Sequence, residues 1–196
     1  MGHPRAPVEP APAVGAAFWP DLSANVVPAR VGGYEHDVRY LPADGRWLKF
    51  TKPSLAGCVA EIIEGKVGLF LATPLQYLQR WRFANRLFGD DVQLVGLTEE
   101  GNYLRIVVSQ RDLVGEAPTW DELHFAMTEV YGLHLLNTEA SVGGYEARAY
   151  AGDRFAIFDV RPQNCVRTAE GDVVPFDVIP QVLKKADAAL LHGLRR

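Results

Sequence analysis

The stretch of residues 155–180 constrains the fold of this chain most, because it contains two short apolar runs separated by a turn. The runs, 155–158 and 173–176, have the length and composition of β-strands, and residues 168–172 have the composition of a hairpin turn between them. We therefore expect a β-hairpin near the C-terminus of the chain.

Polar side chains stand where these two predicted strands end. Asp159 follows the first run, Asn164 lies five residues later, and Asp177 follows the second run. Carboxylate and amide oxygens are the hard ligands that Mg²⁺ prefers in proteins. The pattern predicts a site in which two of these side chains hold a metal ion and the third accepts a proton.

The composition predicts an intracellular protein with one core. At 196 residues, 48% of them hydrophobic, the chain can form a single domain or two small lobes. The net charge of −4 gives no electrostatic signal for nucleic-acid binding. Two cysteines are too few for a disulfide framework, and neither a membrane-length apolar span nor a signal peptide is present, so we expect a cytoplasmic location.

The N-terminal half begins with a disordered arm and a hairpin. Residues 1–15 are rich in proline and alanine and are predicted to be disordered, whereas residues 16–196 are predicted to form one domain. Strands over 34–40 and 46–51 flank a turn sequence, and alternation along the second strand lets Lys49 reach from an apolar sheet into a cleft. The alternatives are that Lys49 is a solvated strand lysine or that Lys52 has this role.

A helix is predicted between Thr73 and Gly89. Thr73 is the expected N-cap, Gln76 completes a capping box, and Gly89 is a typical stop. Apolar residues recur at helical spacing on one face, and the arginines of this helix are interpreted as part of a solvated face: Arg80, Arg82 and Arg86.

Residues 54–71 stay largely unassigned, apart from a short helix predicted over 59–64 and a strand predicted over 67–71. Periodicity and capping signals predict the elements that follow. Strands are predicted over 92–97 and 103–109, completing a sheet with the first hairpin. A second capping box at 119–122 opens a helix that ends at Gly132, and two histidines with no ligand spacing are predicted to be structural or solvated. The remaining predicted elements are a strand over 145–150 that pairs with 155–158, and a final helix from about 181.

The order of these parts resembles that of protein-kinase-like phosphotransferases. In that group an Asp-x₄-Asn catalytic loop precedes a metal-binding aspartate, as Asp159, Asn164 and Asp177 do here. More narrowly, the chain resembles the polyvalent protein kinase domain family, small kinase-like domains of phages and mobile elements. The matching segments are 33–36, 45–53, 72–78, 85–91, 107–110 and 159–164.

This resemblance implies an α+β, protein-kinase-like fold. A small antiparallel sheet lobe with one helix would span about 30–110, and a reduced helical lobe with β-hairpins would span about 117–196. It also implies that ATP and Mg²⁺ are the cofactors, with the segment 109–116 meeting the adenine. The acceptor of the phosphoryl group is not specified by the resemblance.

The resemblance also assigns roles to individual residues. Asp159 would orient or deprotonate an acceptor hydroxyl, and Asn164 and Asp177 would hold Mg²⁺. Lys49 would balance the charge of the phosphates, as the strand lysine of a kinase does. The backbone at two neighbouring glycines would approach a phosphate: Gly32 and Gly33.

Two departures from the family leave two functions open. The chain has only Gly32 and Gly33 in place of a glycine-rich loop, and Gln76 stands where a glutamate that pairs with the lysine is common. Glu61 or Glu64 is an alternative source of that carboxylate. The chain is therefore expected to be an ATP-dependent phosphotransferase or, alternatively, an inactive nucleotide-binding pseudokinase that serves as a protein-interaction module.

Overall fold

The computed structural model describes residues 33–63, 66–100, 102–138 and 142–195. These residues form four small antiparallel sheets and three α-helices, so the expected mixture of helices and antiparallel strands is confirmed. None of the helices described is long and apolar enough to span a membrane. The predicted arm, residues 1–15, lies outside the described residues.

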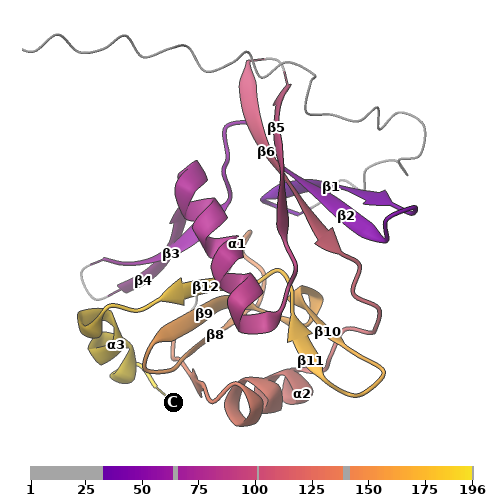
Figure 1. Cartoon of the computed structure of the whole chain (residues 1–196). Helices are drawn as coiled ribbons and strands as arrows, with labels where there is room; N and C mark the ends of the chain where they lie inside the picture. Colours follow the sequence, from indigo (N-terminus) through magenta and orange to yellow (C-terminus); the bar gives the residue numbers. More distant parts are fainter. Residues whose placement is uncertain (1–32, 64–65, 101, 139–141, 196) are drawn as a thin grey trace, which may run out of the picture.

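The first sheet has four antiparallel strands in the order β1-β2-β6-β5, and it occupies the upper part of Figure 1. The predicted first hairpin is confirmed, with Val38 opposite Lys49. Leu48 and Phe50 pack with Val107, whereas Lys49 extends from the other face of its strand. The strands are β1 (His36–Leu41), β2 (Arg46–Thr51), β5 (Gln93–Glu100) and β6 (Tyr103–Arg111).

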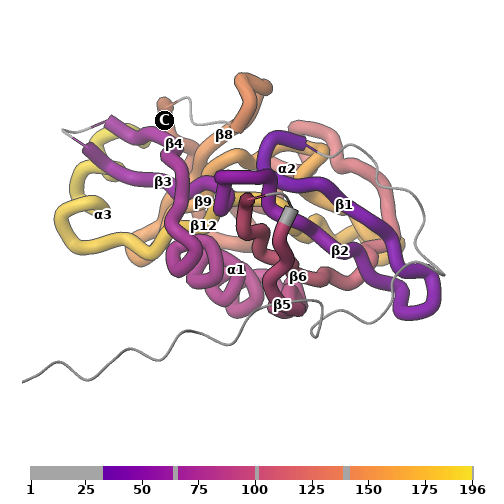
Figure 2. Tube along the Cα trace, turned by 90° about the horizontal axis from the view of Figure 1, so that it is seen from above, coloured from indigo at the N-terminus to yellow at the C-terminus, as the bar shows by residue number. Residues whose placement is uncertain are grey.

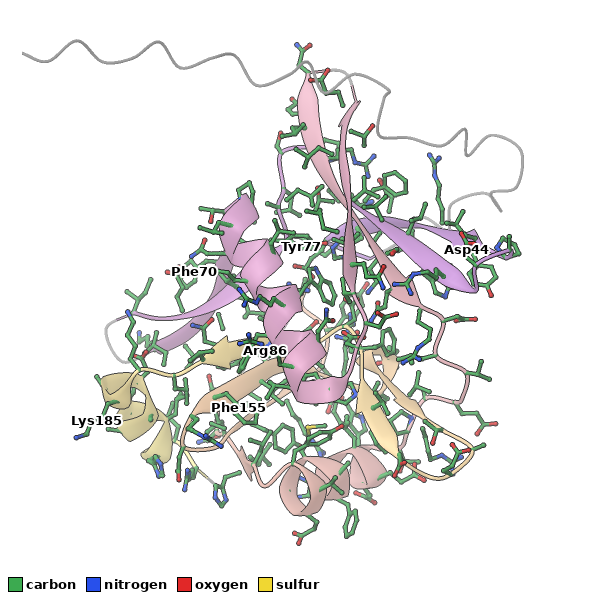
Figure 3. All side chains as sticks on the ribbon, in the orientation of Figure 1. Asp44, Phe70, Tyr77, Arg86, Phe155 and Lys185 are labelled. Carbon is green, nitrogen blue, oxygen red and sulfur yellow. The ribbon has the colours of Figure 1, made fainter. Side chains whose placement is uncertain are left out.

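The helix α1 (Pro74–Phe88) packs against this sheet. Its predicted ends are confirmed: the side chain of Thr73 accepts a hydrogen bond from the backbone of Gln76, and Gly89 adopts a left-handed conformation with φ of 67°. Figure 3 shows Tyr77 between α1 and the strands, where it is fully buried. The buried apolar residues of this helix are Tyr77, Trp81 and Ala84.

The segment that the sequence left largely unassigned is a second hairpin, β3 (Cys58–Ile63) and β4 (Lys66–Leu71). The helix predicted over 59–64 is wrong, whereas the strand predicted over 67–71 is confirmed. Val59 packs under α1 and Ala60 packs into a different core cluster, so alternate residues of β3 face different neighbours. This two-sided burial suits a strand rather than a helix. Figure 2 shows the hairpin beside α1.

The second four-stranded sheet has the order β12-β9-β8-β7 and lies in the lower part of Figure 1. The predicted pairing of the runs 155–158 and 173–176 is wrong: the turn at 168–172 joins β10 (Cys165–Arg167) to β11 (Val173–Pro175). The first run lies in β9, which pairs with β12 along one edge and with β8 along the other. This strand is buried on both faces. The strands of this sheet are β7 (His134–Leu135), β8 (Arg148–Ala151), β9 (Phe155–Val160) and β12 (Ile179–Val182).

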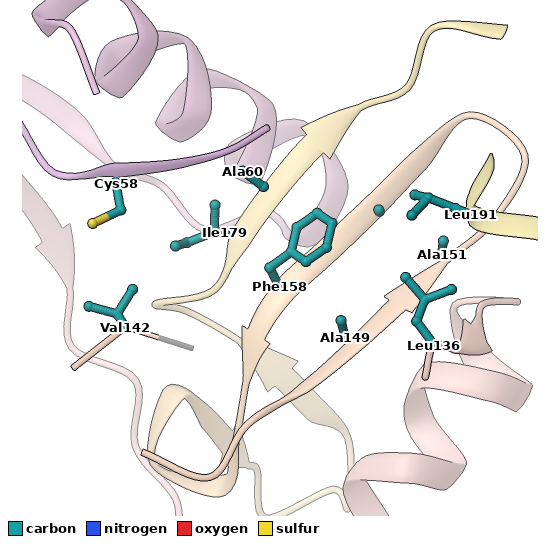
Figure 4. Packing of buried hydrophobic residues seen from close by; sticks show 10 residues of the cluster. Cys58, Ala60, Leu136, Val142, Ala149, Ala151, Phe158, Ile179 and Leu191 are labelled. Atoms are coloured by element: carbon teal, nitrogen blue, oxygen red, sulfur yellow. The ribbon is translucent and has the colours of Figure 1, made fainter. Parts of the chain in front are cut away.

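The two remaining helices flank this sheet. The second capping box is confirmed, and α2 (Trp120–Phe125) continues as a π-helical turn over Ala126–Val130. The final helix, α3 (Lys185–His192), starts later than predicted, because the preceding residues form β12 and pair with β9. Figure 4 shows the core of this half, in which Phe158 and Ile179 lie on neighbouring strands with Leu191 of α3 nearby.

Candidate functional site

A cavity of about 300 Å³ lies between the first sheet and the hairpin β10–β11. Its walls come from β1, β2, the end of β6, β10 and the residues after β11. Two of the predicted site residues, Lys49 and Asp177, line this cavity. It therefore joins side chains that are far apart in the sequence.

Lys49 is a buried residue of the cavity wall and forms an ion pair there. Its Nζ donates a hydrogen bond to Oδ1 of Asp177 at 3.2 Å. The same ammonium group lies 4.8 Å from the ring centroid of Trp81 and 5.8 Å from that of Phe176. Aromatic faces attract cations, so the charge of Lys49 is held in place from several sides.

Asp177 is a carboxylate that stays ionised at neutral pH. Burial opposes its ionisation, but the charges of Lys49 and Arg80 outweigh this effect and lower the pKa of Asp177 to about 2. About a third of the side chain remains exposed, with a relative accessibility of 32%. An ionised and partly accessible carboxylate is suited to bind a hard cation.

Asp159 and Asn164 form a second, closed centre next to the first. Asn164 donates through Nδ2 to the backbone oxygen of Asp159 at 2.8 Å and to its Oδ2 at 2.9 Å. The other carboxylate oxygen of Asp159 accepts a hydrogen bond from the backbone N–H of Val142 at 3.0 Å. Both side chains are buried, and Asp159 is only 4% exposed.

The environment of Asp159 makes it a stronger base than an ordinary aspartate. Burial raises the pKa of Asp159 to about 6, although hydrogen bonds from Val142 and Asn164 and the nearby charge of Arg161 act in the opposite direction. Its φ of 55° is left-handed, which costs about 1–3 kcal/mol for a residue with a side chain. A raised pKa and backbone strain often occur together at functional sites.

The backbone of Asn164 connects the two centres. Its carbonyl oxygen accepts hydrogen bonds from the N–H groups of Phe176 at 3.0 Å and of Asp177 at 3.4 Å. Among the described residues, the side-chain hydrogen bonds of Asn164 use only its nitrogen, so the amide oxygen can accept a bond from another partner. The structure thus brings Lys49, Asn164, Asp159 and Asp177 together.

The predicted glycines are not part of this arrangement. Gly32 lies outside the described residues, and Gly33 is exposed and is not among the residues that line the cavity. Lys52, the alternative to Lys49, forms an ion pair with Asp37 instead. The arrangement therefore favours Lys49 over Lys52 as the cation of the site.

Gln76 does not reach Lys49. Its Oε1 accepts a hydrogen bond from the backbone N–H of Thr73 at 2.9 Å, so its role as a helix cap is confirmed. Glu61 is exposed on β3, and Glu64 lies outside the described residues. The carboxylate that contacts Lys49 is that of Asp177.

A buried ion pair between Glu35 and Arg80 was missed by the sequence analysis. The two terminal nitrogens of the guanidinium group lie 2.7 and 2.9 Å from the two carboxylate oxygens, and Arg80 also donates to the backbone oxygen of Cys58 at 2.9 Å. The interpretation of Arg80 as part of a solvated face is wrong, whereas Arg82 and Arg86 are exposed. Arg80 follows Tyr77 at helical spacing, and this spacing is the signal that could have placed Arg80 on the buried face of α1.

His36 lies between the two ion pairs. Ligand atoms of Glu35, His36 and Asp177 all lie within 4.8 Å of one another. Nε2 of His36 is hydrogen-bonded to the hydroxyl of Tyr77 at 2.8 Å, and burial lowers the pKa of His36 to about 4. Both oxygens of Glu35 are bonded to Arg80, and Nε2 of His36 is bonded to Tyr77. We therefore interpret Glu35 and His36 as parts of a charge network rather than as metal ligands.

A larger groove of about 870 Å³ lies along the outer face of α1, between β3 and β12. Gln76, Arg82 and Arg86 line it, but none of the predicted site residues does. The chemistry that the sequence predicts therefore belongs to the smaller cavity.

No protein-family model, no curated protein and no solved structure matches this chain. The site itself combines one lysine, one ionised carboxylate, one amide oxygen and one aspartate of raised pKa. Such a set can bind a metal ion together with an anionic ligand and can accept a proton from it.

Proposed function

We propose that this protein is a kinase-like phosphotransferase that binds ATP with Mg²⁺ and transfers a phosphoryl group to a hydroxyl acceptor. The observation that carries the proposal is the meeting of Lys49 and Asp177, 128 residues apart in the sequence, at one cavity. The backbone of Asp177 is in turn bonded to Asn164, whose side chain bonds Asp159. The resemblance to kinase-like domains assigned a role to each of these four residues.

The order of elements supports the kinase-like interpretation. Apart from the hairpin β3–β4, which comes between them, a lysine on the second strand of the first hairpin precedes α1 and two further strands. An Asp-x₄-Asn loop, the hairpin β10–β11 and an aspartate follow later in the chain. This is the order that a kinase-like domain would have. The chain differs in having one α-helix, α3, after Asp177 among the described residues, so the second lobe would be a reduced one.

The cavity suits a nucleotide whose base lies against its apolar wall and whose phosphates lie near Lys49. Its volume of about 300 Å³ lies at the lower end of small-molecule sites. Val38, Trp47 and Val166 supply apolar surface, and a hydrogen bond of 2.8 Å from Nε1 of Trp47 to Asp112 fixes the indole ring. Lys49 would then face the phosphates.

Asp177 and Asn164 would hold the metal ion. The carboxylate of Asp177 is ionised, and the amide oxygen of Asn164 is not used by its side-chain hydrogen bonds, so the donor set fits a hard cation. Bound Mg²⁺ supplies positive charge that neutralises the phosphate oxygens. Lys49 would add a second positive charge at the same place.

Asp159 would act as the general base. It would take the proton of the acceptor hydroxyl as the acceptor oxygen bonds to the terminal phosphorus of ATP, and ADP would leave with the electron pair of the broken P–O bond. With a pKa of about 6, Asp159 is ionised at pH 7 and is more basic than an ordinary aspartate. Asn164 would keep its carboxylate oriented.

A second candidate function is a nucleotide-binding module without catalysis. Both carboxylate oxygens of Asp159 already accept hydrogen bonds, and the side chain is almost completely buried. An acceptor hydroxyl would have to approach past the backbone of Val142. This closed geometry favours the non-catalytic alternative.

The test is a measurement of MgATP affinity by calorimetry beside ATP turnover. We expect Asp177→Asn to weaken MgATP binding about tenfold or more, because it removes the charged ligand. Asp159→Asn should leave the affinity nearly unchanged and should lower turnover by about 10²–10⁴-fold, the usual contribution of a general base. Asp153→Asn is the matched control, because Asp153 is an exposed aspartate beside α3 that pairs with His192.

The outcomes separate the two candidates. A wild-type protein that binds MgATP, but shows no turnover with a panel of hydroxyl acceptors, would establish the non-catalytic module. If the wild type binds neither ATP nor GTP at millimolar concentration with Mg²⁺ present, both candidates are wrong.

A further inference from the structure

Asp90 is a buried carboxylate for which the proposed site has no role. It follows Gly89 at the end of α1 and is only 5% exposed. Its Oδ1 accepts a hydrogen bond from Nε2 of Gln110, but within the described part of the chain its Oδ2 has no hydrogen-bond partner. A buried oxygen without a partner is costly and calls for an explanation.

Gln110 connects Asp90 to the cavity. The same Nε2 donates to the backbone oxygen of Phe176 at 3.0 Å, and Gln110 lines the cavity together with Lys49 and Asp177. In the pairing of β2 with β6, Trp47 is opposite Gln110 and Lys49 is opposite Val108. The side chains of Lys49 and Gln110 therefore lie on the same face of the sheet.

Of the two described cations that act on Asp90, one is available to it. The charged groups that act on this carboxylate are Lys49 of β2, Arg80 of α1 and Asp177. Arg80 already bonds both oxygens of Glu35. Lys49 carries three N–H donors and gives one of them to Asp177, so it can contact a second carboxylate.

We propose that Asp90 is the second carboxylate partner of Lys49, and that it holds the lysine when Asp177 binds a metal–nucleotide complex. The proposal rests on the proposed function. A carboxylate that binds a divalent cation no longer balances the charge of the lysine fully, and Gln76 does not replace it. Asp90 is thus a positioning residue that acts through Lys49 on the phosphates.

The proposal implies a proton release on nucleotide binding. Burial, together with the charge of Asp177, raises the pKa of Asp90 to about 7, so about half of the ligand-free molecules carry a proton on Asp90 at pH 7. Pairing with Lys49 requires the ionised form. Below pH 7 the proton must be lost on binding, so the affinity for MgATP should rise about tenfold between pH 6 and pH 8.

The first test uses the ligand-free protein. Asp177→Asn removes the competing partner of Lys49 and the negative charge that disfavours ionisation of Asp90. The pKa of Asp90, followed by side-chain carboxyl NMR and assigned with Asp90→Asn, should fall by at least about one unit. An unchanged pKa of Asp90 would overturn the pairing.

The second test measures MgATP affinity at pH 6 and pH 8. Asp90→Asn retains an oxygen for Gln110 but cannot ionise, so it should weaken binding about tenfold at pH 8 and hardly at pH 6. The control is Asp91→Asn: Asp91 is the adjacent, more exposed aspartate, has a φ of 49° that asparagine tolerates, and pairs with Arg46. It should leave the pH profile unchanged.

The two tests distinguish failure of this inference from failure of the proposed function. If the wild type binds MgATP and Asp90→Asn binds it equally well at pH 8, the inference is wrong while the proposed function stands. A different outcome is that the wild type binds no nucleotide while the pKa of Asp90 falls in Asp177→Asn. The proposed function is then wrong, and so is the role of Asp90 in holding Lys49 during nucleotide binding. Only the pairing of Asp90 with Lys49 would then remain.

Discussion

Two ion pairs lie close together in this protein, and they differ in burial and in geometry. Glu35 and Arg80 are both buried and are joined by two hydrogen bonds of 2.7 and 2.9 Å. Lys49 and Asp177 share one hydrogen bond of 3.2 Å, and Asp177 is partly exposed at a cavity. The first pair joins the residue before β1 to α1, whereas the second joins β2 to the segment after β11.

The difference separates a structural pair from a functional one. A bidentate and fully buried pair cannot exchange partners without leaving a charge unpaired in the interior. A single contact beside a cavity can be replaced by a ligand at much lower cost. We therefore expect the Glu35–Arg80 pair to determine stability and the Lys49–Asp177 pair to determine binding.

The largest effect should come from breaking the structural pair. Glu35→Gln leaves Arg80 buried without its counter-charge and should lower the free energy of unfolding by about 3–5 kcal/mol. Lys49→Met should cost only about 1–2 kcal/mol, because Asp177 can be hydrated. Urea denaturation at pH 7 measures both losses. Equal losses for the two variants would contradict the distinction.

A somewhat smaller effect is expected from His36, which lies between the two pairs. The pKa of His36 is lowered from 6.5 in the unfolded chain to about 4 in the folded protein. The unfolded chain therefore binds the proton first, and the stability that neutral His36 contributes is complete above pH 6.5 and is lost as the pH falls toward 4.

The loss between pH 7.5 and pH 4.5 should be about 2–3 kcal/mol larger in the wild type than in His36→Gln. Other groups titrate in the same range in both proteins, so the comparison between them isolates the contribution of His36. Unfolding free energies from urea titrations at the two pH values are the measurement. A parallel loss in both proteins would show that His36 does not stay neutral.

Stabilisation by MgATP should distinguish the two ion pairs, with an effect about as large as that expected for His36. MgATP at 100 times its dissociation constant should stabilise the wild type by about 2.7 kcal/mol. Lys49→Met should lose most of this stabilisation, whereas Glu35→Gln should retain it at temperatures where the variant is folded. Thermal melts with and without MgATP measure the effect, and Mg²⁺ alone serves as the control. Retained stabilisation in Lys49→Met would remove Lys49 from the site.

The smallest effect is expected at Gln76. Its side chain caps α1 and lies away from Lys49, so Gln76→Glu should change the free energy of unfolding by only a few tenths of a kcal/mol. Its affinity for MgATP should equal that of the wild type in calorimetry. A clear gain in affinity would show that residue 76 reaches the lysine after all.

Elements with local signals could be predicted from the sequence. The capping box at Thr73 and the stop at Gly89 determine both ends of α1 within the chain segment itself, and both were confirmed. The same holds for the first hairpin, where alternation also indicated the face on which Lys49 lies. The helix predicted over 59–64 was wrong because the apolar pattern there is short. Only the pairing of this segment with β4 distinguishes a strand from a helix.

The candidate site follows the same division. The spacing of Asp159, Asn164 and Asp177 is a local feature, so the sequence alone indicated these residues. Their predicted places at strand ends needed correction, because Asp159 lies within β9 and Asn164 lies in a 3-10 turn over Pro162–Asn164. The sequence did not indicate that Arg80 is buried and paired with Glu35, because these two residues are 45 positions apart in the chain. Nor did it indicate that Oδ2 of Asp90 is buried without a hydrogen-bond partner among the described residues.

The sequence by itself thus determined which polar groups are available and most of the elements that carry them. Only the tertiary structure decided which cation pairs with which carboxylate. The physical reason is that a charge is stabilised or penalised according to burial and to neighbours within a few ångströms, and both arise only when separate elements pack together. Propensity and capping act within a few residues and hold no such information.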